Sequence, residues 1–290
     1  MVDTLRQTVW SSWAIALGLA MMALATMAQP AHAGVTFVPH RAVYEISLVS
    51  SASGSGVSEM TGRMVYELTG SQCEGFTQNM RFVTRSSNQE GIETTNDLRT
   101  SSWEEAGGKR LRFSSTQYQN DAIIEASQGD AARQKGAKGE DETRVELARP
   151  AKKRIALPGD VYFPMQHAAA LIEAARTGKT LVTANIYDGS EKGERYYATT
   201  AIIGKKLEHA ATPDTVSNKI AANLAGVVAW PMSISYFETG KDHEDAPPAY
   251  ELSFNYFENG ITKDLKIDYG EFAIKGELTQ LDLLPASKCR

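Results

Sequence analysis

Apolar and polar residues alternate with a period of two along most of this chain after residue 40. The clearest case is the segment 250–256, which reads YELSFNY and places its aromatic and aliphatic residues on every second position. Successive side chains of a strand point to opposite faces of a sheet, so this pattern indicates strands with one buried face. The alternation therefore predicts a mainly β protein.

The same pattern, together with the turn-forming residues between segments, locates the strands. Strands are predicted at 41–48, 59–68, 76–84, 92–103, 110–118, 122–126, 143–148, 153–157, 179–187, 194–203, 227–237, 250–256, 261–269 and 272–284. No change of composition marks a linker. We expect one antiparallel sheet that curls or closes like a spiral or barrel, because curling shields sheet edges that an open sheet would expose.

Three segments carry more specific local predictions. The polar stretch 129–142 is expected to form an exposed hairpin tip. Pro231 lacks a backbone N–H, which places its part of the strand 227–237 at an edge or a bulge. Asn259-Gly260 predicts a type I′ hairpin turn, in which both central residues need a positive φ.

One segment has helical rather than strand periodicity. From Pro164 to Thr177 the apolar residues follow a helical spacing, proline stands in the first turn, and Gly178 follows the end. This predicts one amphipathic helix that packs against the sheet or fills the mouth of a barrel. The segment 212–225 is predicted only as a loop or a short helix.

The first 33 residues have the pattern of a cleaved secretory signal peptide. A weakly basic start leads to the uncharged run 14–25, AIALGLAMMALA, which is shorter than the ~20 apolar residues that span a bilayer. Ala31-His32-Ala33 supplies an A-x-A cleavage site before Gly34. We expect an exported, periplasmic protein whose single β-rich domain covers 34–290, without a membrane-spanning segment.

The expected export bears on the state of the two cysteines. In an oxidising compartment an even number of cysteines favours a disulfide, and Cys73 and Cys289 permit only one intramolecular pair. Such a bridge would hold the end of the last strand against an early hairpin turn. The alternative is a reactive thiol, but the chain has no C-x-x-C motif.

Few residues suggest catalysis, a metal or nucleic acid. The chain lacks the common hydrolase, zinc-protease and phosphate-loop motifs, and its net charge of −5 argues against a nucleic-acid binder that relies on attraction to phosphates. The four histidines after residue 33 are scattered: His40, His167, His209 and His243. His243 lies beside Asp242, Glu244 and Asp245, where a solvated acidic loop is favoured over a metal site. No catalytic residue, metal ligand or cofactor is predicted.

A binding function remains. The inner face of a curled sheet can hold an apolar ligand, and several aromatic residues are expected to point into this interior. They are Tyr44, Tyr66, Phe82, Phe113, Phe254 and Tyr256. These side chains either line a cavity or fill the interior completely, and the sequence does not separate the two.

Several segments together resemble the EipB family of periplasmic cell-envelope integrity proteins. The resemblance lies in 39–45, PHRAVYE; 62–67, GRMVYE; 73–75, CEG; 187–190, YDGS; Trp230-Pro231; 235–237, SYF; and the closing 281–289. It implies a curled β-spiral with a Cys73–Cys289 disulfide, a role in the Gram-negative envelope, and a likeness to periplasmic lipoprotein carriers. It supplies no catalytic residue and no ligand.

The residues and the resemblance lead to one expectation with two rivals. We expect a non-enzymatic periplasmic protein that supports envelope integrity by binding an unidentified envelope component or protein partner. The first alternative is a carrier of lipid or lipoprotein acyl chains. The second is an envelope hydrolase, which would require His40 or His167 to meet carboxylates in a cleft.

Overall fold

The computed structural model describes residues 34–212, 217–240 and 246–289, and contains fourteen strands and three short helical segments. The strands are β1 (His40–Ser51), β2 (Glu59–Ser71), β3 (Gly75–Ser87), β4 (Glu93–Glu104), β5 (Arg110–Gln119), β6 (Ala122–Lys135), β7 (Asp141–Arg149), β8 (Lys153–Pro158), β9 (Leu181–Ile186), β10 (Tyr197–Ile203), β11 (Ala229–Glu238), β12 (Tyr250–Phe257), β13 (Thr262–Asp268) and β14 (Phe272–Leu283). The helical segments are α1 (Pro164–Arg176), α2 (Asn218–Asn223) and the 3₁₀ turn η1 (Glu191–Gly193).

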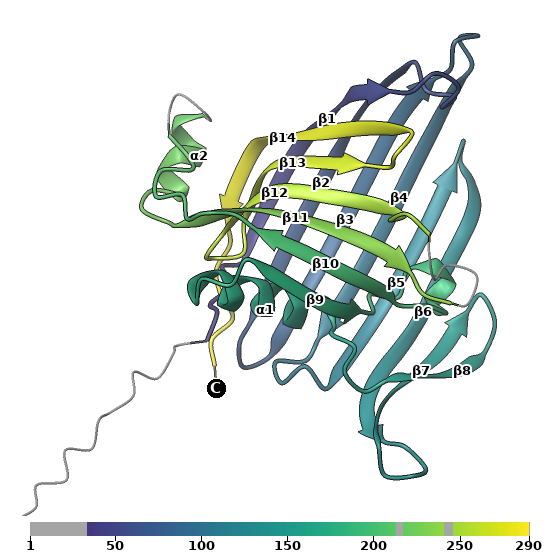
Figure 1. Ribbon diagram of the computed structural model, residues 1–290, viewed down its shortest axis with the longest axis vertical. Coiled ribbons are helices and arrows are strands. Elements are labelled where there is room, and N and C mark those ends of the chain that lie inside the picture. Colours follow the sequence, from purple (N-terminus) through teal and green to yellow (C-terminus); the bar gives the residue numbers. More distant parts are fainter. Residues whose placement is uncertain (1–33, 213–216, 241–245, 290) are drawn as a thin grey trace, which may run out of the picture. The chain divides into compact units, whose positions relative to one another are not determined.

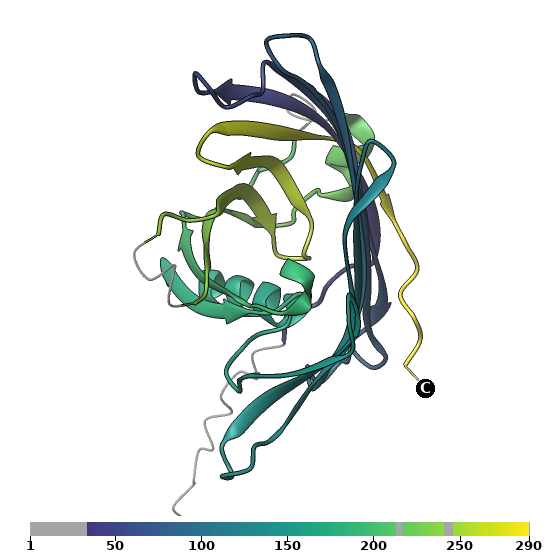
Figure 2. The ribbon, with the colours of Figure 1, turned by 90° about the vertical axis from the view of Figure 1, so that its right-hand side faces the viewer.

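All fourteen strands belong to one antiparallel sheet. Their order is β8-β7-β6-β5-β4-β3-β2-β1-β14-β13-β12-β11-β10-β9, so the last strand of the chain pairs with the first. The sheet bends back on itself, so that β9–β14 lie in front of the broad surface formed by β2–β6 (Figures 1 and 2). The predicted mainly β, curled antiparallel fold is confirmed.

The described residues from 34 onward form one compact unit. Residues 1–33 lie outside the described residues. The signal peptide predicted there, and the boundary of the β domain, therefore stay predictions. Within the described ranges, neither helix is long and apolar enough to cross a membrane.

The two faces of the sheet differ in composition. Side chains on one face belong to clusters of buried apolar residues, as Leu68, Phe76 and Leu111 do. The opposite face carries exposed ion pairs such as Arg81 with Asp97 and Arg112 with Asp130. We call the first the inner face, because it is the concave side of the bent sheet (Figure 2).

Helix α1 lies inside the bend, between β9–β10 and the broad part of the sheet (Figure 2). Its residues Leu171 and Ile172 are 2% and 0% exposed, and they pack in one cluster with Trp230 and Tyr256. The predicted helix packed against the sheet is thus present, one residue shorter than expected. Most of the undecided segment 212–225 is described, and it contains the short helix α2.

Two local predictions were wrong. The expected exposed tip at 129–142 is mostly strand, because β6 continues to Lys135 and β7 starts at Asp141. Its small and polar residues pair across β6 and β7, and only 136–140 turn. The prediction of an exposed tip failed because polar residues occur both at the ends of strands and in loops.

The edge or bulge predicted at Pro231 is confirmed as a bulge. After the pair Ile203–Met232, the next bridge on the β10 side is Leu207–Ala229, so residues 204–206 stand opposite residues 230 and 231. The register partner of Pro231 in β12 is Asn255. The carbonyl of Pro231 accepts from Gly204 N–H at 2.7 Å, so its nitrogen also points to that side. The missing N–H donor of Pro231 therefore falls within this bulge.

The hairpin turn between β12 and β13 is not type I′. Among its described residues only Gly260 has a positive φ, 87°, whereas type I′ also requires one at Asn259. The Gly260 N–H donates to Phe257 O at 2.9 Å, and the Asn259 side chain accepts from Ile261 N–H. A Cβ on Gly260 would collide with Phe37, so glycine is required here for space as well as for backbone conformation.

Candidate functional site

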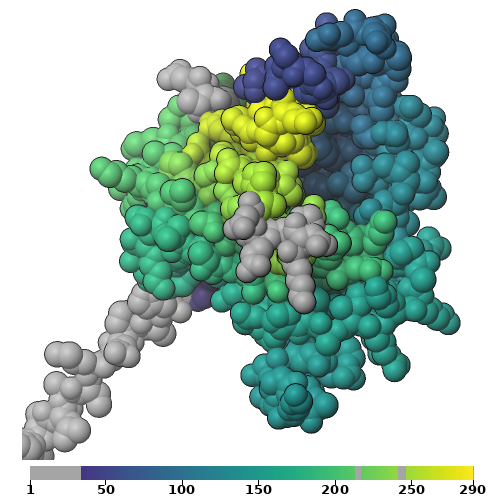
Figure 3. All heavy atoms as spheres, turned by 45° about the vertical axis from the view of Figure 1, so that its right-hand side comes forward, coloured from purple at the N-terminus to yellow at the C-terminus, as the bar shows by residue number. Residues whose placement is uncertain are grey.

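The surface is hollowed between the yellow strands β13–β14 and the blue strands β3–β5 (Figure 3). The inner face of the sheet is reached through this opening. We call the space the cleft, and its two sides the polar wall and the aromatic row. Each side is built by side chains that alternate along neighbouring strands.

The polar wall is formed by half-buried, uncharged side chains of β3, β4 and β5. Register pairs such as Met80–Thr100 and Thr100–Ser115 place them on one face. The wall consists of Gln78, Thr94, Asn96, Thr100, Ser102, Ser115 and Gln117. Met80 and Leu98 add apolar surface between them. The residues that alternate with the wall point outward and include the charged Arg81, Asp97 and Arg99.

The aromatic row crosses β10 to β14 and consists of Tyr197, Tyr236, Tyr250, Tyr269 and Phe272. Tyr236 and Tyr250 are register partners with stacked rings 4.5 Å apart, and Tyr269 stacks on Phe272 at 4.9 Å. Such ring pairs contribute about 0.5–1.5 kcal/mol each beyond the area that they bury. The row therefore holds the strands of this side together.

The floor of the cleft joins its two sides. Tyr66 of β2 packs with the cluster that includes Tyr236, and its hydroxyl donates to Gln78 Oε1 of the polar wall at 3.0 Å. Within the described residues, the Gln78 Nε2 atom is buried and has no hydrogen-bond partner. Phe82 of β3 and Tyr269 both pack against one apolar cluster.

The tyrosine side chains of the aromatic row are largely buried, but some of them keep part of their surface accessible. Burial raises the pKa of the Tyr250 and Tyr269 hydroxyls above the ordinary value of 10. Both side chains nevertheless keep part of their area exposed. A narrow cleft shields such groups from bulk water while leaving them accessible to a ligand. Because their pKa lies above 10, both hydroxyls are neutral hydrogen-bond donors at physiological pH.

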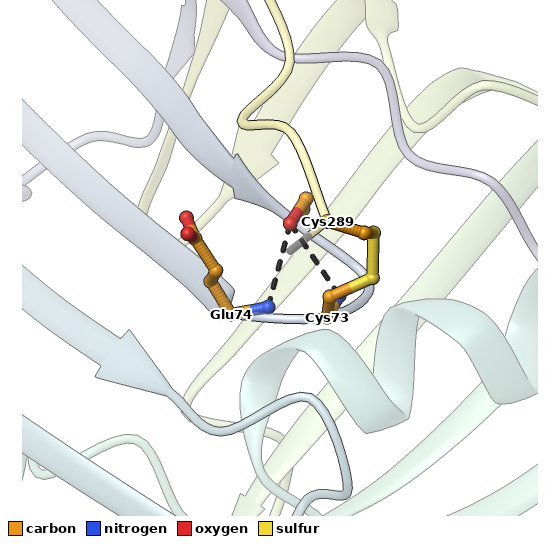
Figure 4. The surroundings of a disulfide bond; sticks show 4 residues. Cys73, Glu74 and Cys289 are labelled. Carbon is orange, nitrogen blue, oxygen red and sulfur yellow. Dashed lines mark hydrogen bonds between the residues drawn. A yellow bond between two sulfur atoms is a disulfide. The ribbon is translucent and has the colours of Figure 1, made fainter.

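The structure joins Cys73 and Cys289 in a disulfide, with the two Cα atoms 5.6 Å apart (Figure 4). Cys73 stands in the turn between β2 and β3, where Ser71 Oγ accepts from the N–H groups of Cys73 and Glu74. The tail after β14 runs past this turn, with Ser287 N–H donating to Gly70 O at 3.4 Å. Free cysteines are absent from the part of the chain that the structure describes.

The histidines are not gathered in the cleft. His40 on β1 and His167 on α1 are 1% and 4% exposed, and burial lowers the pKa of both, that of His167 to about 4. His40 Nδ1 bonds Val38 O at 2.7 Å, and His167 Nε2 bonds Thr199 Oγ1 at 3.3 Å. Neither is hydrogen-bonded to a described carboxylate.

The two remaining histidines also give no site. His209 follows β10 in a surface segment, and His243 with its acidic neighbours lies outside the described residues. Over the described ranges, the structure brings no three histidine, cysteine or acidic side chains together in a group that could hold a metal.

Sequence reasoning missed a buried carboxylate that holds α1 in place. Glu104, at the end of β4, accepts from Met165 N–H at 2.7 Å and from Gln166 N–H at 3.0 Å. The N-terminus of α1 is therefore capped by a side chain from a distant strand, and not by a residue next to the helix in the sequence. Burial raises the pKa of Glu104 to about 7, although the two N–H donors and the nearby Arg133 oppose this rise.

Arg133 completes this junction. Its guanidinium donates to Gly159 O, Val161 O and Gln166 Oε1 at 2.6–2.7 Å, and it lies over the ring of Phe163. This contact leaves no local sequence signal, because these groups that accept from Arg133 are more than twenty residues further along the chain.

The six aromatic residues expected in the interior are all there, but they belong to different groups. Tyr44, Phe113 and Tyr256 are buried, and the other three are half-buried. Three separate apolar clusters contain them. These residues account for the packed part of the interior, whereas the accessible surface of the cleft comes mainly from the polar wall, which the sequence analysis did not single out.

Two open grooves lie elsewhere on the surface. One of about 660 Å³ follows the C-terminal end of α1 and contains Arg176, Lys179 and Glu258. The other, about 710 Å³, lies beside the edge strand β9 and contains Arg133 and Asp160. Both are lined partly by charged residues that already form ion pairs or hydrogen bonds. The cleft differs from them because its wall residues are uncharged and several are unpaired.

The fold and the cleft define a class of protein: a single curled antiparallel sheet, fastened by one disulfide, with an accessible uncharged inner face. Comparisons with known proteins show the family to which this fold belongs. The chain matches the family model described as EipB-like over residues 31–285. It is 37% identical over 261 residues to the cell envelope integrity protein EipB of Brucella abortus (strain 2308), covering 90% of this chain and 89% of that one.

A solved structure is also similar. It is a crystal structure of a β-barrel-like protein of domain of unknown function DUF1849 from Brucella abortus. The TM-score is 0.78 at 36% identity, and the match covers 87% of this chain and 100% of the other. The chain therefore belongs to the EipB-like family, as its sequence motifs predicted.

Proposed function

We propose that this protein maintains the integrity of the bacterial cell envelope by binding an envelope component or a protein partner in the cleft. The observation that carries the proposal is the accessible polar wall of β3–β5 facing the aromatic row. A face that served only to fill a core would be mostly apolar, as the packed clusters of the inner face are. The envelope role is inferred from the Brucella relative, which is a cell envelope integrity protein.

The proposed site of action is the periplasm. The signal-peptide pattern of residues 1–33 supports export. The Cys73–Cys289 disulfide supports an oxidising compartment, because such bonds persist there and are rare in the cytosol.

The proposed activity is binding without catalysis. The buried positions of His40 and His167 support this, since a general base must reach a substrate and hold a pKa near the working pH. A hydrolase built on either histidine would need a carboxylate partner, and the described contacts of both are with a carbonyl and a hydroxyl.

A carrier of acyl chains is the second candidate. Met80 and Leu98 on the inner face favour it, because they give the cleft an apolar strip between the polar residues. Native mass spectrometry of the protein purified from its own host separates the two candidates. A co-purifying mass of a lipid or acyl group would support the carrier, and a bare chain mass would count against it.

Deletion of the gene tests the envelope role. We expect the deletion strain to become more sensitive to detergents and to wall-directed antibiotics, and expression of the intact gene to restore resistance. A deletion strain as resistant as its parent would contradict the proposal.

A further inference from the structure

We propose that the cleft binds an uncharged segment of a glycan, a chain of sugar rings bearing hydroxyl or acetamido groups. This inference rests on the proposed function and names the class of component that is bound. It starts from charge. The seven residues of the polar wall carry none, although the outward positions of the same strands hold arginine and aspartate. A charged ligand would find no partner on this wall.

Two charged side chains lie beside the polar wall and are already engaged. Glu104 is buried as the cap of α1, and Glu125 at the start of β6 accepts from Lys192 N–H at 3.2 Å. Neither belongs to the polar wall.

Two more carboxylates lie beside the aromatic row. Glu191 accepts from the Tyr197 hydroxyl at 3.0 Å, and Asp188 is close enough to Tyr236 and Tyr250 to act on both electrostatically. The uncharged surface of the cleft is therefore the polar wall, and a neutral ligand is the complement of that wall.

The hydrogen-bonding groups of the wall are available. The side chains of Thr100, Ser102, Ser115 and Gln117 make no hydrogen bond to any described residue. They supply both donors and acceptors, because a hydroxyl or a primary amide can do either. Sugar hydroxyls have the same dual character, so each contact can form in either direction.

The aromatic row provides the second element of sugar recognition. The C–H bonds on the face of a pyranose ring carry a partial positive charge and pack against the negative face of an aromatic ring. Tyr250 and Tyr269 are partly accessible, and their neutral hydroxyls add donors at the edge of the row. A ligand between the two walls can thus meet rings on one side and amides and hydroxyls on the other.

Two other occupants fit less well. An acyl chain would cover the unpaired hydroxyls and amides of the wall without hydrogen-bonding to them, which costs free energy for each group. An extended peptide is usually held by the free backbone of a sheet edge, whereas the strands lining the cleft are paired on both sides. A glycan needs neither an apolar wall nor a free edge.

The test uses the protein purified from its own host and the tetrasaccharide chitotetraose as an uncharged probe. Binding is measured by calorimetry and by tyrosine fluorescence. A matched pair of variants in β4 locates the site: Thr100→Val removes a hydroxyl from the polar wall, and Thr95→Val removes one from the outer face. We expect Thr100→Val to weaken binding about fivefold, the usual effect of one neutral hydrogen bond, and Thr95→Val to leave it unchanged.

A myristoyl lysolipid and a neutral serine–glycine peptide serve as competing probes. Binding of either one without binding of chitotetraose would overturn the glycan inference, as would equal effects of the two threonine variants. An absence of chitotetraose binding at millimolar concentration would also overturn it. These results leave the envelope role intact if deletion of the gene still sensitises cells. Glycan binding by a protein whose deletion has no envelope phenotype would instead contradict the proposed function alone.

Discussion

Glu104 shows how one residue fastens an element that is distant in the sequence. Its carboxyl group is 2% exposed and bonds the first N–H groups of α1, sixty residues further along the chain. Because burial raises its pKa to about 7 in the folded protein, against 4.5 ordinarily, the folded state binds a proton more tightly than the unfolded state. Its contribution to stability is therefore complete below pH 4.5 and is lost as pH rises through 7.

The replacement Glu104→Gln tests this linkage, because glutamine can still accept from the helix N–H groups but does not titrate. We expect the free energy of unfolding of the native protein, relative to the variant, to fall between pH 5 and pH 8 by on the order of 3 kcal/mol. Urea unfolding at several pH values measures it. A constant difference between the two proteins across this range would contradict the assignment.

His167 is expected to act in the opposite direction. Burial lowers its pKa from 6.5 to about 4, so the folded state disfavours the charged ring. This contribution to stability is complete above pH 6.5 and is lost as pH falls towards 4. In His167→Gln, which keeps a side-chain donor for Thr199, the stability should decline less between pH 7 and pH 5 than in the native protein. The same urea series measures this, and a parallel decline in both proteins would show that the ring does not titrate as inferred.

At the scale of elements, α1 is stabilised by packing on one face and by contacts with Glu104 at its start. Ile172 has no exposed area and lies in the largest apolar cluster, whereas Glu173 beside it is partly exposed and pairs with Arg176. We expect Ile172→Ala to lower the free energy of unfolding by about 2–5 kcal/mol, through lost transfer energy and the cavity left behind. Glu173→Ala, as the control, should cost less than about 1 kcal/mol. Equal losses in urea unfolding would contradict the assigned position of the helix.

The disulfide fastens the tail that follows β14 to the turn between β2 and β3. Replacing both cysteines, as Cys73→Ser with Cys289→Ser, removes a link across a sequence separation of 216 residues. We expect a loss of about 2–5 kcal/mol in the free energy of unfolding. Amide exchange should rise first in the tail and the end of β14. Unchanged stability and exchange would show that the strand pairing of β14 with β1 holds the end alone.

The sequence predicted the elements better than their connections. Period-two alternation and turn residues located all fourteen strands, and the helical stripe with Pro164 located α1. It failed where the outcome depends on a distant neighbour. The turn at Asn259 is shaped by its contact with Val38, whose N–H donates to Asn259 O at 2.9 Å. This neighbour is not visible in the local pattern.

The same limit applies to the candidate site. The aromatic residues of the interior could be predicted because their alternation is a local property. The polar wall could not, since threonine, serine and glutamine on one face of a strand usually indicate an exposed face. Only the return of β9–β14 over the sheet places them inside a cleft.

At the scale of the whole described protein, the bending of one sheet produces both the packed interior and the accessible cleft. Near α1 the inner face is covered by apolar side chains. Beyond it, the inner faces of β3–β5 remain uncharged and partly accessible (Figure 3). Our central claim is that this accessible part is the working surface of the protein in the envelope.

Filling the cleft in living cells tests this claim most directly. Ser115→Trp places a large ring on the polar wall, and Ser114→Trp, its neighbour in β5, places the same ring on the outer face. Each variant is expressed in the deletion strain at equal levels of folded protein, and resistance to detergent and wall-directed antibiotics is measured. We predict that Ser114→Trp restores resistance and Ser115→Trp does not. Full restoration by Ser115→Trp would contradict the claim.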